Sequence, residues 1–112
     1  VYQQIMEQIR GSILKGALTP GERIASVRDL AAQARVNPNT VQRALTELER
    51  EGLLVGGGTN GRTVTKDALV LQKMRQQALE DLARECAEKF MVFGVSPAQA
   101  AELLRGLEKE ER

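Results

Sequence analysis

The chain has 112 residues, of which 42% are hydrophobic, with 16 basic and 15 acidic side chains. This balance predicts one small globular domain, or one domain with a short appendage, and excludes a largely disordered chain. The sequence contains no histidine and one cysteine, which excludes imidazole zinc sites, Ser-His-Asp hydrolysis and a disulfide framework. We therefore expect a binding protein with no catalytic residues, no metal and no cofactor.

The distribution of charge along the chain predicts its compartment and its partner. The longest run without a charge, residues 90–101, is too short to span a bilayer, and no signal peptide opens the sequence. These features predict a cytoplasmic protein with no membrane partner. Residues 1–66 hold nine basic and six acidic side chains, a net charge of +3, whereas residues 67–112 carry −2. The imbalance favours a polyanion as the partner of the first part.

Two helices are predicted before residue 36. Apolar residues at steps of three and four predict an amphipathic helix over residues 2–15, and a Thr-Pro-Gly turn follows it. Ser26 and Asp29 have the spacing of a capping box, in which the serine hydroxyl accepts a hydrogen bond from the amide three residues later. They predict the start of a second, short helix that ends near Ala34.

A third helix and a hairpin follow. Asn37 is a good N-cap and Pro38 suits the first helical position, so we expect a helix from there to Gly52. Residues 53–65 hold two short strand-like runs around a glycine-rich stretch, which predicts a β-hairpin. No Gly-Lys-Ser/Thr follows these glycines, so a phosphate-binding loop is disfavoured.

The helical pattern returns after residue 66. A long helix is predicted over residues 67–93, ended by Gly94, and a last helix opens at Ser96 and Pro97. One apolar stripe at helical spacing runs along the long helix and consists of Leu71, Met74, Ala78, Leu82, Cys86, Phe90 and Phe93. The expected fold is mostly α-helical with a small β-hairpin.

Two helices joined by a three- or four-residue turn and followed by a hairpin describe a winged helix-turn-helix. In that motif the second helix enters the DNA major groove with its N-terminal residues leading. Those residues are Asn37, Asn39, Thr40, Gln42 and Arg43. Gln42 suits adenine, and Arg43 suits guanine or a phosphate. Ser26 and Arg28, at the start of the preceding helix, suit a phosphate.

The run from Ile24 to Leu54, IASVRDLAAQARVNPNTVQRALTELEREGLL, resembles the DNA-binding domain of GntR-family bacterial transcription regulators. The second half, with its long helix, FGVSP and a short last helix, resembles the YtrA-like subfamily, whose short C-terminal part dimerises. The resemblance implies a winged helix-turn-helix over residues 1–66 and a two-helix dimerisation arm over residues 67–112.

The resemblance also implies which residues contact double-stranded DNA. On the two helices these are Ser26, Arg28, Asn37, Asn39, Thr40, Gln42 and Arg43, and in the wing they are Asn60, Gly61 and Arg62. The family's wing usually carries basic residues before a Gly-Thr-Phe-Val run, whereas residues 57–64 here keep only Arg62. Fewer basic residues predict weaker non-specific binding and a shallower salt dependence.

The remaining implications concern assembly and regulation. The apolar stripe of the long helix predicts a two-fold homodimer, and two related recognition helices predict an inverted-repeat operator. The resemblance implies a repressor, with control of a transporter operon as in YtrA-like proteins. A small-molecule effector would bind between the helical arms or at the domain junction.

Alternative interpretations apply to several of these features. Arg28 and Arg43 could be ordinary solvated surface, and Ser26 and Asn37 could serve only as helix caps. Cys86 is expected to pack in the stripe, with an intersubunit disulfide as the minority hypothesis. A winged helix that binds a protein instead of DNA is the rival function, but the polar leading face of the third helix argues against it.

Overall fold

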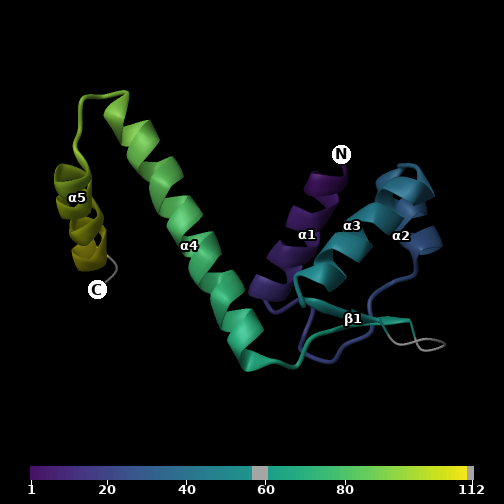
Figure 1. Cartoon of the computed structure of the whole chain (residues 1–112). Coiled ribbons are helices and arrows are strands. Elements are labelled where there is room, and N and C mark those ends of the chain that lie inside the picture. The colour runs from purple at the N-terminus through teal and green to yellow at the C-terminus, as the bar shows by residue number, and fades with distance from the viewer. Residues whose placement is uncertain (57–60, 111–112) are drawn as a thin grey trace. The chain divides into compact units, whose positions relative to one another are not determined.

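The computed structural model describes residues 1–56 and 61–110 (Figure 1). The described residues form α1 (Tyr2–Leu14), α2 (Val27–Ala34), α3 (Pro38–Arg50), β1 (Leu54–Gly56), β2 (Arg62–Val64), α4 (Ala68–Met91) and α5 (Pro97–Glu110). The predicted fold class, mostly α-helical with a small hairpin, is confirmed. The chain divides into two compact units, Val1–Arg75 and Gln76–Arg112, so the boundary lies within α4.

The core of the first unit lies between α1, α2, α3 and the hairpin (Figure 1). Helices α1 and α3 supply most of its side chains, because each carries apolar residues on one face at a spacing of three or four. The buried residues of these two helices are Ile5, Met6, Ile9, Ile13, Val41, Ala44, Leu45 and Leu48. The hairpin adds Leu54 and Val64, and the segment before α2 adds Ile24.

Side-chain caps fix the starts of α2 and α3 where the sequence predicts them. The Asp29 amide donates to Ser26 Oγ at 3.1 Å, and the Asn39 amide donates to Asn37 Oδ1 at 2.8 Å. Between the two helices Arg35 adopts a left-handed conformation with φ +55°, which lets the chain reverse while Val36 packs on the core. The two helices are therefore joined by three residues, as a helix-turn-helix requires.

Glycines with positive φ end α3 and α4. At Gly52 (φ +84°) and Gly94 (φ +73°), the following amide donates back to a carbonyl of the last helical turn, as in a Schellman motif. This motif ends α4 at Met91, so the prediction that Phe93 lies on the helix is wrong. Phe93 lies two residues beyond the end of the helix and is 82% exposed.

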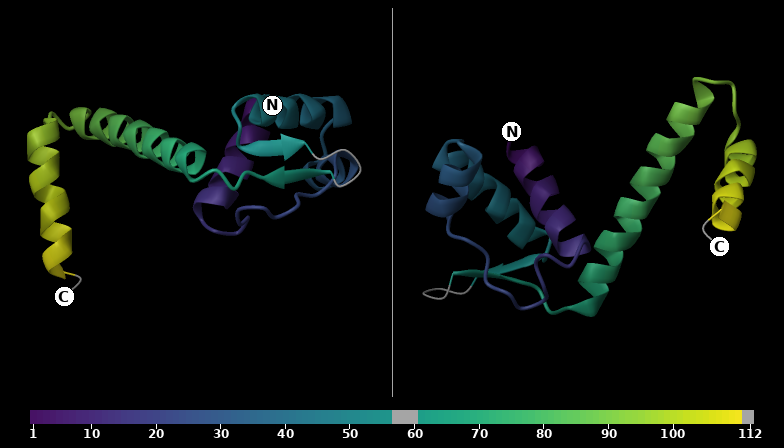
Figure 2. Two further views of the ribbon diagram at one scale, coloured as in Figure 1. Left: turned by 60° about the horizontal axis from the view of Figure 1, so that its bottom comes forward. Right: turned by 180° about the vertical axis from the view of Figure 1, so that it is seen from behind.

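The hairpin pairs as two antiparallel strands, with Val55 opposite Thr63 and Gly56 opposite Arg62 (Figure 2). A third extended segment, which the sequence pattern did not predict, lies on the other edge of β2. The Ile24 amide donates to the Arg62 carbonyl at 3.0 Å, and the Val64 amide donates to the Glu22 carbonyl at 2.9 Å. Residues 22–24 therefore connect the hairpin to the start of α2.

An ion pair links α1 to the end of α3. Arg10 Nη2 donates to Glu51 Oε1 at 2.6 Å, and Arg10 also pairs with Glu7 on its own helix. Partial burial lowers the pKa of the Arg10 guanidinium, but the hydrogen bond and the charge of Glu51, together with Glu7, raise this pKa further than burial lowers it. The net shift is upward, so Arg10 keeps its charge over the accessible pH range.

The long helix α4 has different surroundings in its two parts. Val70, Leu71 and Met74, in its first turns, are half-buried and pack against the core of the first unit. In the second unit, Ala78, Cys86 and Phe90 are half-buried, whereas Leu82 is 60% exposed. The predicted apolar stripe is therefore continuous in sequence but divided between two environments.

We expect Leu48→Ala to lower the free energy of unfolding by about 2–5 kcal/mol, because Leu48 is fully buried and its loss leaves a cavity. Leu69→Ala is the matched control, since Leu69 is 72% exposed, and its effect should stay within about 0.5 kcal/mol. Urea unfolding followed by circular dichroism measures both. Equal effects of the two substitutions would contradict the assignment of Leu48 to the core.

Candidate nucleic-acid interface

The N-terminal ends of α2 and α3 expose the polar residues that the sequence singles out. Ser26 and Arg28 are exposed at the start of α2, where the first backbone amides have no partner within the helix. At the start of α3, Thr40 is half-buried, whereas four other residues are exposed: Asn37, Asn39, Gln42 and Arg43. The first turns of both helices therefore offer hydrogen-bond donors and acceptors to a ligand.

Capping and DNA contact compete for some of these atoms. Ser26 Oγ and Asn37 Oδ1 each accept a backbone amide, so these oxygens are already used by the fold. The hydroxyl proton of Ser26 and the amide NH2 of Asn37 remain free to donate to a phosphate or base. Further along α3, Gln42 Nε2 lies 3.4 Å from Thr46 Oγ1, a long contact that a stronger partner would replace.

Arg43 stacks on an aromatic ring of another helix. Its Cζ atom lies 4.0 Å from the centroid of the Tyr2 ring of α1, and Tyr2 is half-buried against the core. A cation–π contact at an exposed site is worth about 0.5–1 kcal/mol. The ring therefore holds the guanidinium at a defined place, and a DNA contact that draws it off the ring loses this energy.

The structure gives Arg62 an intramolecular partner. Its Nε donates to Glu49 Oε1 of α3, and the Arg62 side chain is only 19% exposed. The same carboxylate lies over Gly56, where an added Cβ would be 3.4 Å from Glu49 Oε2. The pair of Arg62 and Glu49 therefore attaches the hairpin to the last turns of α3, and the charge of Arg62 is compensated there.

A different cation lies beside the wing. Arg23 is exposed, and a Cβ added to Gly61 would lie 3.3 Å from Arg23 Nε and 3.5 Å from its Nη2. Gly61 has φ +73°, a conformation that favours glycine, and its missing side chain leaves room for the guanidinium. Sequence reasoning missed Arg23, because nothing in its local pattern shows that residues 22–24 pair with β2. Asn60, the other residue expected in the wing, lies outside the described residues.

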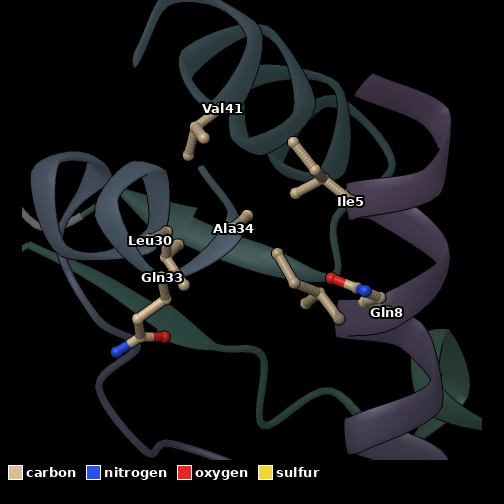
Figure 3. A pocket seen from close by; sticks show the side chains of 7 residues that line it. Ile5, Gln8, Leu30, Gln33, Ala34 and Val41 are labelled. Carbon is tan, nitrogen blue, oxygen red and sulfur yellow. The ribbon is translucent and has the colours of Figure 1, made fainter. Parts of the chain in front are cut away.

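A cavity of about 260 Å³ lies among α1, α2 and α3 (Figure 3). Aliphatic side chains form most of its lining, and Gln8 and Gln33 supply its polar atoms. The lining residues are Ile5, Gln8, Ile9, Leu30, Gln33, Ala34 and Val41. None of these side chains titrates.

The described residues contain no group of three or more Cys, Asp or Glu side chains placed to hold a metal ion. None of the described helices has the length and apolar character needed to cross a membrane.

The sequence matches the model of the family described as "Bacterial regulatory proteins, gntR family" over residues 1–64. It is 35% identical over 111 residues to the "Uncharacterized HTH-type transcriptional regulator YhcF" of Bacillus subtilis, covering 99% of this chain and 82% of that protein. It is 46% identical over 77 residues to the "HTH-type transcriptional repressor YtrA" of Bacillus subtilis, covering 66% of this chain and 59% of that protein.

Solved structures of similar fold extend over both units. A "GntR family transcriptional regulator from Listeria monocytogenes" has a TM-score of 0.83 and 26% identity, covering 94% of this chain and 92% of that one. The structure of "AraR(DBD) in complex with operator ORR3" has a TM-score of 0.55 and 30% identity, covering 57% of this chain and 77% of that one. The chain therefore belongs to the gntR family of bacterial regulatory proteins and is a DNA-binding transcription regulator of the YtrA-like type.

Proposed function

We propose that this regulator is a repressor that binds an inverted-repeat operator as a homodimer. The observation that carries the proposal is the two-sided character of α3, whose apolar face is buried while the residues of its first turns are open to a ligand. The relative named as a repressor and the AraR(DBD) structure with its operator support this proposal. A protein that acts on the chromosome of a bacterium works in the cytoplasm, which is the compartment we propose.

In the proposed complex the first turn of α3 enters the major groove and the start of α2 approaches the phosphate backbone. Gln42 has the geometry to pair with adenine, and Arg43 to contact guanine or a phosphate. Arg28 and the free amides at the start of α2 suit a phosphate, because the helix terminus carries partial positive charge. Asn39 and Thr40 complete the set of hydrogen-bonding side chains on the leading turn.

The homodimer is proposed from the apolar side chains that the second unit leaves in solvent. These include Leu79, Leu82, Met91, Val92, Phe93, Leu103, Leu104 and Leu107, each between 48% and 83% exposed. A concentration of large apolar residues on so short a segment marks an interaction site. Leu71 and Met74 pack on the first unit instead, so we place the proposed interface on the later part of α4 and on α5. An effector and a transporter operon stay predictions of the family resemblance.

The experiment that tests the proposed function is binding to the DNA upstream of the protein's own gene, followed by fluorescence anisotropy. Tight binding that resists competitor DNA, with one dimer per inverted repeat, is the expected result. Binding that disappears with added salt and ignores sequence would contradict operator recognition at this site. No binding at low salt would favour a winged helix that contacts another protein.

We expect Arg43→Ala to weaken operator binding by about 1–3 kcal/mol, because a donor on the leading face of α3 is lost. Arg50→Ala is the matched control on the same helix. Arg50 lies in the last turn, its side chain is 73% exposed, and it pairs only locally with Glu47. Anisotropy titrations of both variants, with circular dichroism to verify folding, give the comparison. Equal affinities for the two variants would remove Arg43 from the DNA-binding site.

We expect Leu82→Glu to produce monomers with weakened operator binding, because a charge would be buried in the proposed apolar interface. Gln77→Glu is the control, since it adds the same charge at an exposed position of α4 on the face opposite Leu79 and Leu82. Sedimentation velocity reports the oligomeric state of each variant. A dimeric Leu82→Glu protein would refute the interface.

A further inference from the structure

We propose that Arg23, which lies outside the helix-turn-helix, provides the phosphate-binding cation of the wing, and that Arg62 has a structural role instead. This inference rests on the proposed DNA-binding function and adds a binding residue to it. The two arginines differ in their surroundings at the hairpin, because Arg62 pairs with a carboxylate of α3 and Arg23 is exposed to solvent.

The charge of Arg62 is compensated within the chain. Its guanidinium pairs with Glu49 of α3, and the two side chains are 19% and 32% exposed. A phosphate would have to compete with this carboxylate for the same donors. If Arg62 moved to DNA, Glu49 would be left as an unpaired carboxylate close to the wing and would repel the phosphate backbone. Both effects make Arg62 a poor phosphate ligand.

The backbone of Arg23 lies at the edge of the hairpin. It forms an antiparallel bridge with Thr63 across the outer edge of β2, through the hydrogen bonds that the flanking residues Glu22 and Ile24 make to Val64 and Arg62. Its side chain is exposed and extends along Gly61, with Nε and Nη2 at 3.3 and 3.5 Å from the place of a Cβ there. In the part of the chain that the structure describes, Arg23 takes part in none of the salt bridges. It therefore offers a full positive charge to solvent at the base of the wing.

The start of α2 follows Arg23 closely in sequence. Ser26, the N-cap of α2, comes three residues after Arg23, and Arg28 lies in the first turn of that helix. Gly61 has no side chain, and a Cβ there would lie 3.3 Å from Arg23 Nε and press on the guanidinium. The segment from Arg23 to Arg28 therefore carries two exposed cations, and the helix start that it leads into also favours an anion.

The test compares the salt dependence of DNA binding among variants of the full chain. The probes are two fluorescein-labelled duplexes of equal length, one from upstream of the gene and one of generic sequence. Arg23→Gln removes the proposed contact, and Arg23→Lys keeps its charge. Glu49→Gln with Arg62→Gln removes both members of the structural pair, so that no lone carboxylate is left. Arg84→Gln is the control for the loss of one charge outside the first unit, because Arg84 is 67% exposed and lies on the face of α4 opposite Leu82.

One phosphate contact contributes about 0.9 to the slope of log affinity against log salt concentration. The proposed dimer carries Arg23 twice, so we expect Arg23→Gln to remove two phosphate contacts and to lower that slope by about 1.8 on both duplexes, since a phosphate contact is independent of sequence. Between about 50 and about 200 mM salt, the affinity ratio of wild type to Arg23→Gln should then fall about 12-fold. Arg23→Lys should restore the slope, and the double variant and Arg84→Gln should leave it unchanged.

Two outcomes would overturn the inference alone. In one, wild type binds DNA and Arg23→Gln keeps the wild-type slope while it remains folded by circular dichroism. In the other, the double variant loses the slope and Arg23→Gln does not, which would return the contact to Arg62. Absence of wild-type binding to both duplexes at low salt would instead refute the proposed function, and this inference with it.

Discussion

Helices α1 and α2 and strand β1 all pack against α3. The residues on the packed face of α3 are almost completely removed from solvent: Val41, Ala44, Leu45 and Leu48. Helix α3 is therefore held along its length by one face. Because the side chains of a helix point in all directions around its axis, a fixed buried face also fixes the direction of the exposed one. The polar residues of its first turns owe their orientation to this apolar packing, and DNA recognition depends on it.

The electrostatics of the wing follow from the same packing. Glu49 lies near the end of α3, where the buried face directs its carboxylate over Gly56 and toward Arg62. The glycine leaves the space and the arginine supplies the opposite charge, so the hairpin is attached to the recognition helix. An ion pair of this kind, half-buried and bridging two elements, specifies a position more than it adds stability. The pair of Arg62 and Glu49 neutralises one cation of the wing, which is then not available to a phosphate. In our proposal Arg23, in the neighbouring segment, supplies the phosphate-binding charge instead.

The second unit differs from the first in how few of its apolar residues are buried. Large apolar residues remain in solvent on the later part of α4 and on α5, whereas Ala100 is the one residue of α5 described as buried. A helical segment of this size has too little interior to enclose so many leucines by itself. An apolar surface with this composition supports the proposed homodimer, in which a second copy of the chain would cover it. The first turns of α4 differ, since the core of the first unit covers them.

Much of this protein could be predicted from local sequence because the signals are local. Ser26, Asn37 and Pro38 predict the starts of two helices through backbone hydrogen bonds made within three residues, and Gly52 and Gly94 predict helix ends because they accept a positive φ. Apolar spacing identified the buried faces of α1 and α3 for the same reason. Helix periodicity also places the predicted interface residues of α3 opposite its buried face.

The contacts between residues far apart in sequence were determined by the tertiary structure alone. The sequence presents Arg62 as the remaining cation of the wing, and folding brings Glu49 beside it. The sequence pattern assigns no role to Arg23, and folding pairs residues 22–24 with β2. The stack of Arg43 on Tyr2 and the covering of Leu71 and Met74 by the core are of the same kind. No local pattern encodes these pairings, because each one depends on how separate elements pack, and packing is a property of the whole folded unit.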